Sequence, residues 1–167
     1  MGTIVTATVR GRSRPAASSD PARRSAIVWI DAREAVVIRW SGDEPMIERL
    51  ASDVPPHTKA TRHVRYDPLA RHGGGESQLA GDRRRIEHLD RFVDAVAAML
   101  AEDDDLVLVG HGTVHERLES RLNELDAAAH RTRLIDARRA DRRTERQLVA
   151  DLREHLGIGP RRRRVGS

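Results

Sequence analysis

Residues 103–125 constrain the fold of this chain more than any other stretch. An uninterrupted apolar run at 106–109 (Leu-Val-Leu-Val) predicts a strand that is buried on both faces. Gly110 and Gly112 then allow a sharp turn, because glycine adopts positive φ without a steric penalty, and Thr113 can cap a new helix. The apolar stripe of that helix comprises Val114, Leu118, Leu122 and Leu125. A strand, a glycine turn and a helix in this order predict an α/β domain.

The composition sets the size of the folded part and excludes several kinds of site. With 167 residues, of which 38% are apolar and 34% are charged, the chain suits one domain flanked by tails. Aromatic residues make up only 2%, so a surface that stacks single-stranded bases on rings is not expected. The absence of cysteine excludes disulfides, thiolate zinc sites and a cysteine nucleophile. The sequence shows no secretory signal and no apolar stretch near the ~20 residues of a membrane span, so we expect a cytoplasmic protein without membrane contact.

Basic residues gather in segments on both sides of the predicted domain. Residues 1–24 are small, basic and proline-containing after a short β-like start, and we interpret them as a disordered arm. Residues 158–167 form a matching basic tail, whose arginines are Arg161, Arg162, Arg163 and Arg164. Both segments could contact an anionic partner such as RNA, or serve only as solvated tails. The formal net charge is +4, and a GC-rich coding sequence explains the many arginines as well as binding does.

Residues 25–157 carry the patterns of one folded domain. Its first part is an antiparallel meander of three strands, which we place at residues 26–30, 35–40 and 46–50. Residues 52–80 show no sustained period, and a loop of this length is usually functional or disordered. The clearest helix follows at 82–100, with Asp82 as its cap and an apolar stripe that includes Ile86.

The second half of the domain alternates strands and helices. After the strand at 106–109 and its following helix, residues 132–136 predict a last strand. Thr144 and Gln147 match a capping box, and the helix that they open ends at Gly157. The order β-β-β-α-β-α-β-α predicts an α/β fold, in which a leading antiparallel meander and β-α-β units form a mixed sheet with helices packed against it.

The turn after the central strand is the best candidate for a binding site. Its residues are Gly110, His111, Gly112 and Thr113. The free N–H groups and the dipole of the following helix attract anions, and α/β proteins usually bind ligands at loops after parallel strands. The sequence is neither a Walker A loop nor a G-x-G-x-x-G fingerprint, so a plain connecting turn explains it as well. It remains a candidate site for an anion such as RNA phosphate.

The eight histidines do not match a metal-binding motif. His57 and His63, together with Arg65, are candidates for ligand contacts in the 52–80 loop. His111 and His115 are four residues apart, but His111 precedes the helix, so the two do not chelate from one helical face. No serine has the context of a nucleophile elbow, and nothing assembles a catalytic triad. We therefore expect no bound metal, no cofactor and no catalytic residues.

Four segments, taken in order, resemble a known family. They are Val-Trp-Ile-Asp-Ala-Arg-Glu-Ala at 28–35, His-Val-Arg at 63–65 followed by glycines, the strand and turn at 106–112, and residues 144–157. The set is similar to small bacterial release-factor-like proteins, often labelled translational machinery proteins. These are related to the third domain of archaeo-eukaryotic peptide release factor 1 and Pelota. Family members usually have histidine where Ala32 stands and proline where His111 stands.

The resemblance implies a three-layer α/β/α domain related to ribosome-associated modules, a domain that recruits partner proteins in full-length release factors. The Gly-Gly-Gln loop that releases peptides belongs to another domain, and residues 73–75 are followed by Glu76, so peptide release is not expected. We expect a non-enzymatic binding module for the ribosome, its rRNA or a translation factor. Two alternatives stay open. One is an enzyme on phosphate or nucleotide ligands that uses the turn at 110–113, and the other is a protein-interaction domain that forms homo-oligomers through an exposed strand edge.

Overall fold

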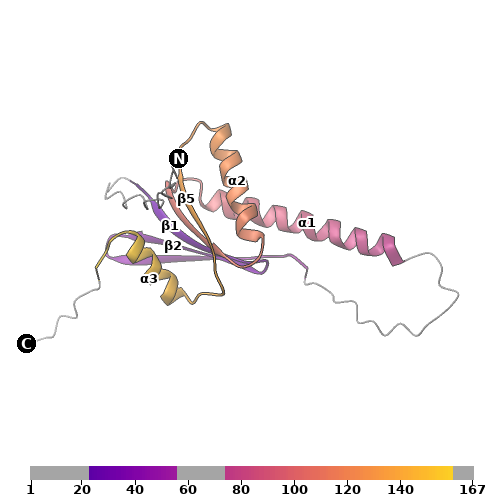
Figure 1. Ribbon diagram of the computed structural model, residues 1–167, viewed down its shortest axis with the longest axis horizontal. Helices are drawn as coiled ribbons and strands as arrows, with labels where there is room; N and C mark the ends of the chain where they lie inside the picture. Colours follow the sequence, from indigo (N-terminus) through magenta and orange to yellow (C-terminus); the bar gives the residue numbers. More distant parts are fainter. Residues whose placement is uncertain (1–22, 56–73, 160–167) are drawn as a thin grey trace, which may run out of the picture.

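The computed structural model describes residues 23–55 and 74–159, which form a five-stranded mixed sheet with helices on both faces (Figure 1). The strands are β1 (Ser25–Ile30), β2 (Glu34–Ser41), β3 (Glu44–Ala51), β4 (Asp105–Gly110) and β5 (Leu134–Arg139). The helices are α1 (Gly74–Met99), α2 (Val114–Ala128) and α3 (Glu145–His155). The predicted α/β class and order of elements are confirmed. No helix in this described part is both long and apolar enough to cross a membrane.

The sheet has the strand order β3-β2-β1-β4-β5 and joins a meander to parallel strands. β1, β2 and β3 pair antiparallel, whereas β4 lies parallel to β1 and β5 lies parallel to β4. Gly42 has a φ of +61° in the two-residue turn between β2 and β3, a conformation that glycine adopts readily. β4 is buried along its whole length, as its apolar run predicts.

Two apolar cores lie on opposite faces of the sheet. α1 and α2 cover one face, where Val28, Leu108 and Leu118 are fully buried. α3 covers the other face, where Trp29 and Leu152 are buried together. The arrangement is therefore a three-layer α/β/α sandwich, with two helices in one outer layer and one in the other.

The predicted capping box of α3 is confirmed. The Thr144 hydroxyl accepts a hydrogen bond from the Gln147 backbone N–H at 3.3 Å, and the Gln147 side-chain oxygen accepts one from the Thr144 N–H at 2.9 Å. Gly157 follows the helix with a φ of +67°, the left-handed conformation that commonly ends helices. These local signals fix both ends of α3.

Two predicted boundaries are wrong. α1 begins at Gly74, so Asp82 lies inside the helix and does not cap it. Apolar periodicity marks only the half of α1 that faces the core, whereas Leu79 and Ile86 are 62% and 46% exposed. β5 occupies Leu134–Arg139 rather than 132–136, because its pairing with β4 continues as far as Arg139.

The N-terminal half of α1 extends beyond the sheet (Figure 1). Arg85 donates a hydrogen bond to the carbonyl of Pro55 at 3.1 Å, and His88 Nδ1 lies 3.0 Å from a carboxylate oxygen of Asp53. These contacts place residues 85–88 beside the chain just after β3. The residues of α1 that precede Arg85 therefore project past the end of the sheet at which β3 ends.

Candidate functional site

The carboxyl ends of β1, β4 and β5 lie at one end of the sheet, because the three strands are parallel. The turn after β1, the turn after β4 and the loop after β5 therefore meet there. The Ala140 N–H donates a hydrogen bond to the carbonyl of Gly110 at 3.0 Å, which links the loop after β5 to the turn after β4. We call this surface the carboxyl edge and define it by residues 31–33, 110–113 and 139–146. Ligands of α/β proteins usually bind at such an edge.

The turn at 110–113 has a different construction from the one that the sequence predicts. Gly112 does adopt a positive φ, of +78°. Gly110 has no positive φ and is instead required by close packing, because an added Cβ would lie 2.7 Å from the Cβ of His115. The predicted side-chain cap at Thr113 is wrong, since its hydroxyl accepts no capping hydrogen bond. The ψ of Thr113 is −3°, whereas a capping side chain needs an extended backbone.

The two histidines near the turn lie in different environments. The side chain of His111 is 64% exposed, and its Nδ1 lies 3.7 Å from a carboxylate oxygen of Asp141. His115 is 4% exposed, and its Nδ1 is buried without a hydrogen-bond partner among the described residues. Within residues 23–55 and 74–159, no three histidine or carboxylate side chains are grouped so as to hold a metal ion. The other predicted candidates, His57, His63, Arg65 and Arg161 to Arg164, lie outside the described residues.

The carboxyl edge carries arginine side chains that have no partner among the described residues. Many arginines of the described part form ion pairs, for example Arg49 with Glu145 and Arg142 with Glu34. A few exposed arginines make no side-chain hydrogen bond or ion pair with another described residue, namely Arg33, Arg83, Arg84, Arg139 and Arg146. The first follows β1, the last two belong to the end of β5 and the start of α3, and the middle two lie on the projecting half of α1. All of them therefore lie at, or project beyond, the same end of the sheet.

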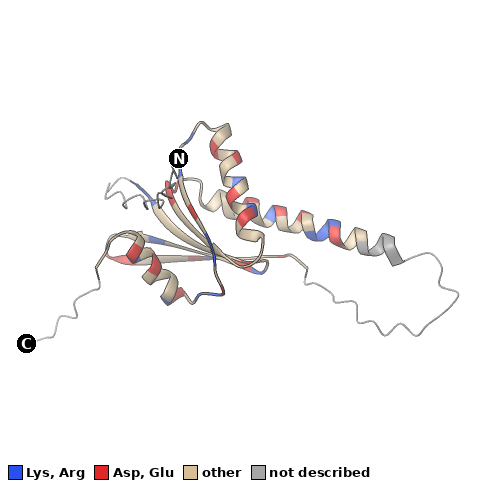
Figure 2. Cartoon of the chain, in the orientation of Figure 1, with Lys and Arg blue, Asp and Glu red and all other residues tan. Residues whose placement is uncertain are grey.

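The cationic surplus of the chain lies outside the described part. Residues 1–22, 56–73 and 160–167 contain 11 of the 30 Lys and Arg and 2 of the 26 Asp and Glu. The described part is left with 19 basic and 24 acidic residues, which is a net charge of −5. Figure 2 shows acidic and basic residues interspersed along α1 and α2, where many of them pair. The folded body is thus not a generally basic surface.

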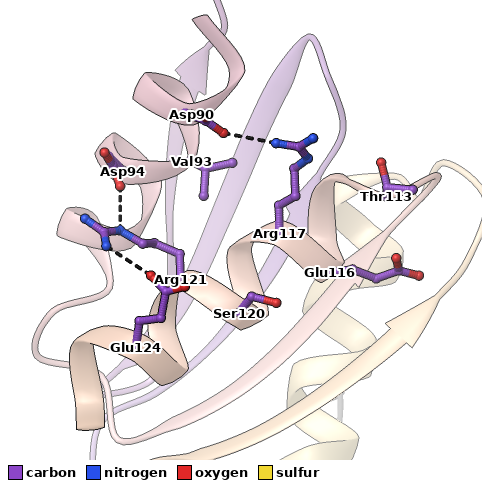
Figure 3. Close-up of a pocket in the computed structure, with 9 residues that line it drawn as sticks. All are labelled: Asp90, Val93, Asp94, Thr113, Glu116, Arg117, Ser120, Arg121 and Glu124. Atoms are coloured by element: carbon purple, nitrogen blue, oxygen red, sulfur yellow. Dashed lines mark hydrogen bonds and ion pairs between the residues drawn. The ribbon is translucent and has the colours of Figure 1, made fainter. Parts of the chain in front are cut away.

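A groove between α1 and α2 is a second concave region, which the sequence analysis missed (Figure 3). It has a volume of about 620 Å³, and Val93 lies among its charged lining residues. Two arginines of α2 cross it: Arg117 reaches Asp90 on α1 at 3.0 Å, and Arg121 reaches Asp94 at 2.7 Å. The hydrogen bond with Asp94 is the main reason that the pKa of Arg121 is raised.

The ion pairs in this groove show what it does for the fold. Acids four residues apart on α1 face arginines four residues apart on α2, so both pairs form along matching helical faces. This equal spacing was the signal in the sequence that could have predicted the pairing of the two helices. Because the groove's arginines are already occupied by carboxylates, the carboxyl edge remains the better candidate for an anionic ligand.

Comparison with known proteins shows a distant likeness in fold. No protein-family model matches the sequence, and no curated protein matches it. Among solved structures, S. cerevisiae Dom34 is described as a translation termination-like factor involved in RNA quality control that interacts with Hbs1. It is similar with a TM-score of 0.43 and 9% identity over 80% of this chain. The archaeal translation termination factor aRF1 is similar with a TM-score of 0.40 and 13% identity over 79% of this chain. The matched region spans 34% of the length of each of these proteins.

Proposed function

We propose that the protein is a non-enzymatic module that binds RNA through its carboxyl edge, with ribosomal RNA as the target. The observation that carries the proposal is the position of the unpaired arginines. Arg33, Arg139 and Arg146 gather at this edge, whereas many arginines elsewhere in the described part are neutralised by carboxylates. A guanidinium group that is not engaged by a carboxylate can bind two phosphate oxygens at once through its parallel N–H donors.

The backbone at the carboxyl edge adds further donors for a phosphate. The first N–H groups of a helix have no partner within the helix, and those at the start of α2 lie directly after the turn. Gly112 has open space around the position of a Cβ, so an anion can approach the backbone there. The exposed ring of His111 lies on the same turn. Side-chain and backbone donors therefore lie along the same edge of the sheet.

The charge distribution would orient an RNA toward this edge. The described part carries −5, which disfavours contact of RNA with most of its surface. Pro55 lies at the end of the molecule where the carboxyl edge lies, and residues 56–73, which contain His57, His63 and Arg65, follow it in the sequence. The basic segments 1–22 and 160–167 add electrostatic attraction, because arginines that neutralise RNA phosphates release the cations condensed on them. Binding is thus expected to combine a local patch with basic segments.

The geometry supports a binding surface better than a catalytic pocket. The side chain of Asp141 is fully exposed, and that of His111 is 64% exposed. Catalytic groups act most strongly where water is excluded and the local dielectric is low. A phosphate-ligand enzyme built on this turn would therefore lack the enclosed environment that its chemistry needs.

The test is cosedimentation of the full chain with bacterial ribosomes at low and moderate salt. It is repeated with a chain that lacks residues 1–22 and 160–167. The proposal predicts salt-sensitive binding that weakens without these segments but survives, because the carboxyl edge is still present. Binding that disappears with the segments would assign the interaction to them alone. An absence of binding at low salt would end the proposal.

A further inference from the structure

β3 is an edge strand whose outer side meets no other described element. It pairs with β2, which places it first in the strand order, and the described helices leave most of it exposed. Seven of its eight residues are exposed, and Met46 and Ile47 are 46% and 36% exposed. An edge strand presents a row of unpaired backbone N–H and C=O groups that can pair with another strand. β3 is therefore a surface on which a strand can be added.

The hydrogen-bonding pattern between β3 and β2 shows which residues of β3 offer these groups on the outer side. The Ser52 N–H donates to the carbonyl of Arg33 on the β2 side at 2.7 Å, so even-numbered positions of this strand face β2. Hydrogen-bonding positions alternate along a strand, and odd-numbered positions therefore face outward. Pro45, which has no N–H to donate, occupies an outward position, where proline is tolerated on an edge strand. Ile47 and Arg49 remain as the outward residues with both a donor and an acceptor near the middle of the strand.

The opposite edge of the sheet is less suited to strand addition. β5 has six residues, compared with eight in β3. Asp136, Arg138 and Arg139 place charges along the second half of β5. Short edge strands with charged side chains are a common protection against edge-to-edge pairing.

We infer that β3 is a dimerisation edge and that its occupant is the β3 strand of a second copy of this chain, running antiparallel. Two-fold symmetry restricts such a pair to registers in which odd-numbered residues meet odd-numbered residues. One of these registers places Glu48 on the two-fold axis. In that register Ile47 of each strand lies opposite the partner's Arg49. The outward N–H and C=O groups of these two residues then hydrogen-bond to each other. The two five-stranded sheets then form one continuous sheet.

The side chains of β3 are self-complementary in this register. Met46 and Leu50 both lie two residues from Glu48 on the same face of the strand, so each Met46 meets the partner's Leu50. Such pairing would cover Met46, which is 46% exposed in the single chain. Pro45 falls opposite Ala51 at the end of the ladder, where its missing N–H removes the fewest hydrogen bonds.

The register places the two Glu48 carboxylates opposite each other, and this like-charge contact disfavours the pairing unless each carboxylate is compensated. Glu48 forms an ion pair with Arg39 of its own chain, and Arg49 forms one with Glu145. The acidic and basic groups that approach the axis are therefore each compensated within the chain that carries them. A copy of β3 meets a nearly neutral edge.

The natural absence of cysteine allows a direct test in the full chain. Glu48→Cys places two thiols on the axis of the dimer, where opposite Cα atoms lie about 4.5 Å apart in a non-hydrogen-bonded pair. This separation falls within the range that a disulfide bridges. Met46→Cys is the matched control, because its two copies would lie about 14 Å apart along the paired strands. We expect Glu48→Cys, but not Met46→Cys, to give a covalent dimer under mild oxidation.

A second variant tests the backbone pairing without introducing a thiol. Ile47→Pro removes an outward N–H and leaves the hydrogen bonds with β2 in place. Light scattering should show a wild-type dimer and at least a tenfold weaker association of the variant, with an unchanged far-UV circular dichroism spectrum. A wild-type chain that stays monomeric at all concentrations overturns the inference. So does equal cross-linking of the two cysteine variants, or a dimer that forms only after residues 1–22 are deleted, which would identify that segment as the occupant of the edge.

Discussion

The side chain of His115 occupies the space that a side chain at position 110 would need. An ideal Cβ on Gly110 would lie 2.7 Å from the Cβ of His115 and 2.7 Å from the carbonyl oxygen of Ile30. Gly110 and Ile30 are register partners at the ends of β4 and β1. His115 is thereby buried over the end of the sheet, and its contact fixes where α2 starts relative to the carboxyl edge.

Gly110→Ala should destabilise the protein. The added methyl group meets the backbone of β1 as well as His115, so a simple rotation of one side chain cannot make room for it. Overpacking of this kind costs about 1–3 kcal/mol of unfolding free energy. Urea denaturation followed by circular dichroism measures the change. A midpoint equal to that of the wild type would show that the end of the sheet is packed less tightly than described.

Gly81→Ala should have the opposite effect. Gly81 lies inside α1, and a Cβ at this position meets nothing within 4 Å. Replacing an exposed helical glycine by alanine stabilises a helix by about 0.5–1 kcal/mol, because alanine loses less conformational freedom on folding. The thermal midpoint of this variant should therefore rise slightly. A lowered midpoint would indicate that residues around position 81 are not helical.

A large loss of stability is expected when the ion pair between Arg39 and Asp103 is removed. The Arg39 Nε lies 3.0 Å from Asp103 Oδ1 and its Nη2 lies 2.9 Å from Oδ2, while the Asp103 side chain is only 2% exposed. The hydrogen bond with Asp103 is the first cause of the raised pKa of Arg39. Asp103→Ala should cost about 3 kcal/mol, because it removes the buried partner of the Arg39 guanidinium and leaves only the half-exposed Glu48 to compensate its charge.

Glu102→Ala is the control for this prediction. Glu102 pairs with Arg24 on the surface, where the two side chains are 77% and 63% exposed. Exposed pairs contribute less than about 1 kcal/mol, because solvent screens them. Chemical denaturation should therefore show a clearly larger loss of unfolding free energy for Asp103→Ala than for Glu102→Ala. Equal losses would contradict the burial of Asp103.

Asp104 should contribute to the acid sensitivity of the fold. Its carboxylate accepts a hydrogen bond from Arg131 at 2.8 Å, and this bond holds the pKa of Asp104 below the ordinary value of 3.8. A depressed folded-state pKa gives stability that is present above the ordinary pKa and is lost as the pH falls through the folded one. The side chain is 36% exposed, so screening limits the effect to less than about 1 kcal/mol.

Asp104→Asn should therefore lose less stability than the wild type between about pH 5 and about pH 3. The amide keeps the shape of the side chain but cannot titrate. Urea midpoints at the two pH values measure the difference. An identical pH dependence in both proteins would show that the pair with Arg131 does not change the proton affinity of Asp104.

Much of the fold could be predicted from the sequence, because its signals are local. The buried run before Gly110 and the capping box at Thr144 each determine structure through nearby residues, and both are confirmed. The start of α1 could not be predicted in this way. The sequence of residues 74–81 shows no apolar stripe of helical period, and glycine is a poor helix former, so neither pattern nor propensity marks them as helical.

The candidate site was predictable only in outline. The turn at 110–113 could be located, because a strand that ends in glycine places its turn at the sheet's carboxyl end. That Gly110 is needed for packing against His115 depends on how α2 sits over the sheet, which the sequence does not state. The same is true of Arg33, Arg139 and Arg146. Their lack of partners emerges only when the ion pairs of the neighbouring arginines are known.

The most direct measurement of the proposed function is the affinity of the full chain for ribosomes after Arg33, Arg139 and Arg146 are all changed to Gln. The matched control changes Arg24, Arg121 and Arg131 to Gln, which removes the same charge away from the carboxyl edge. We predict that the first variant binds at least about tenfold more weakly, with a salt dependence reduced by about one unit per lost phosphate contact. The control should bind nearly as the wild type does. Equal losses in both variants, or wild-type affinity in the first, would contradict RNA binding at the carboxyl edge.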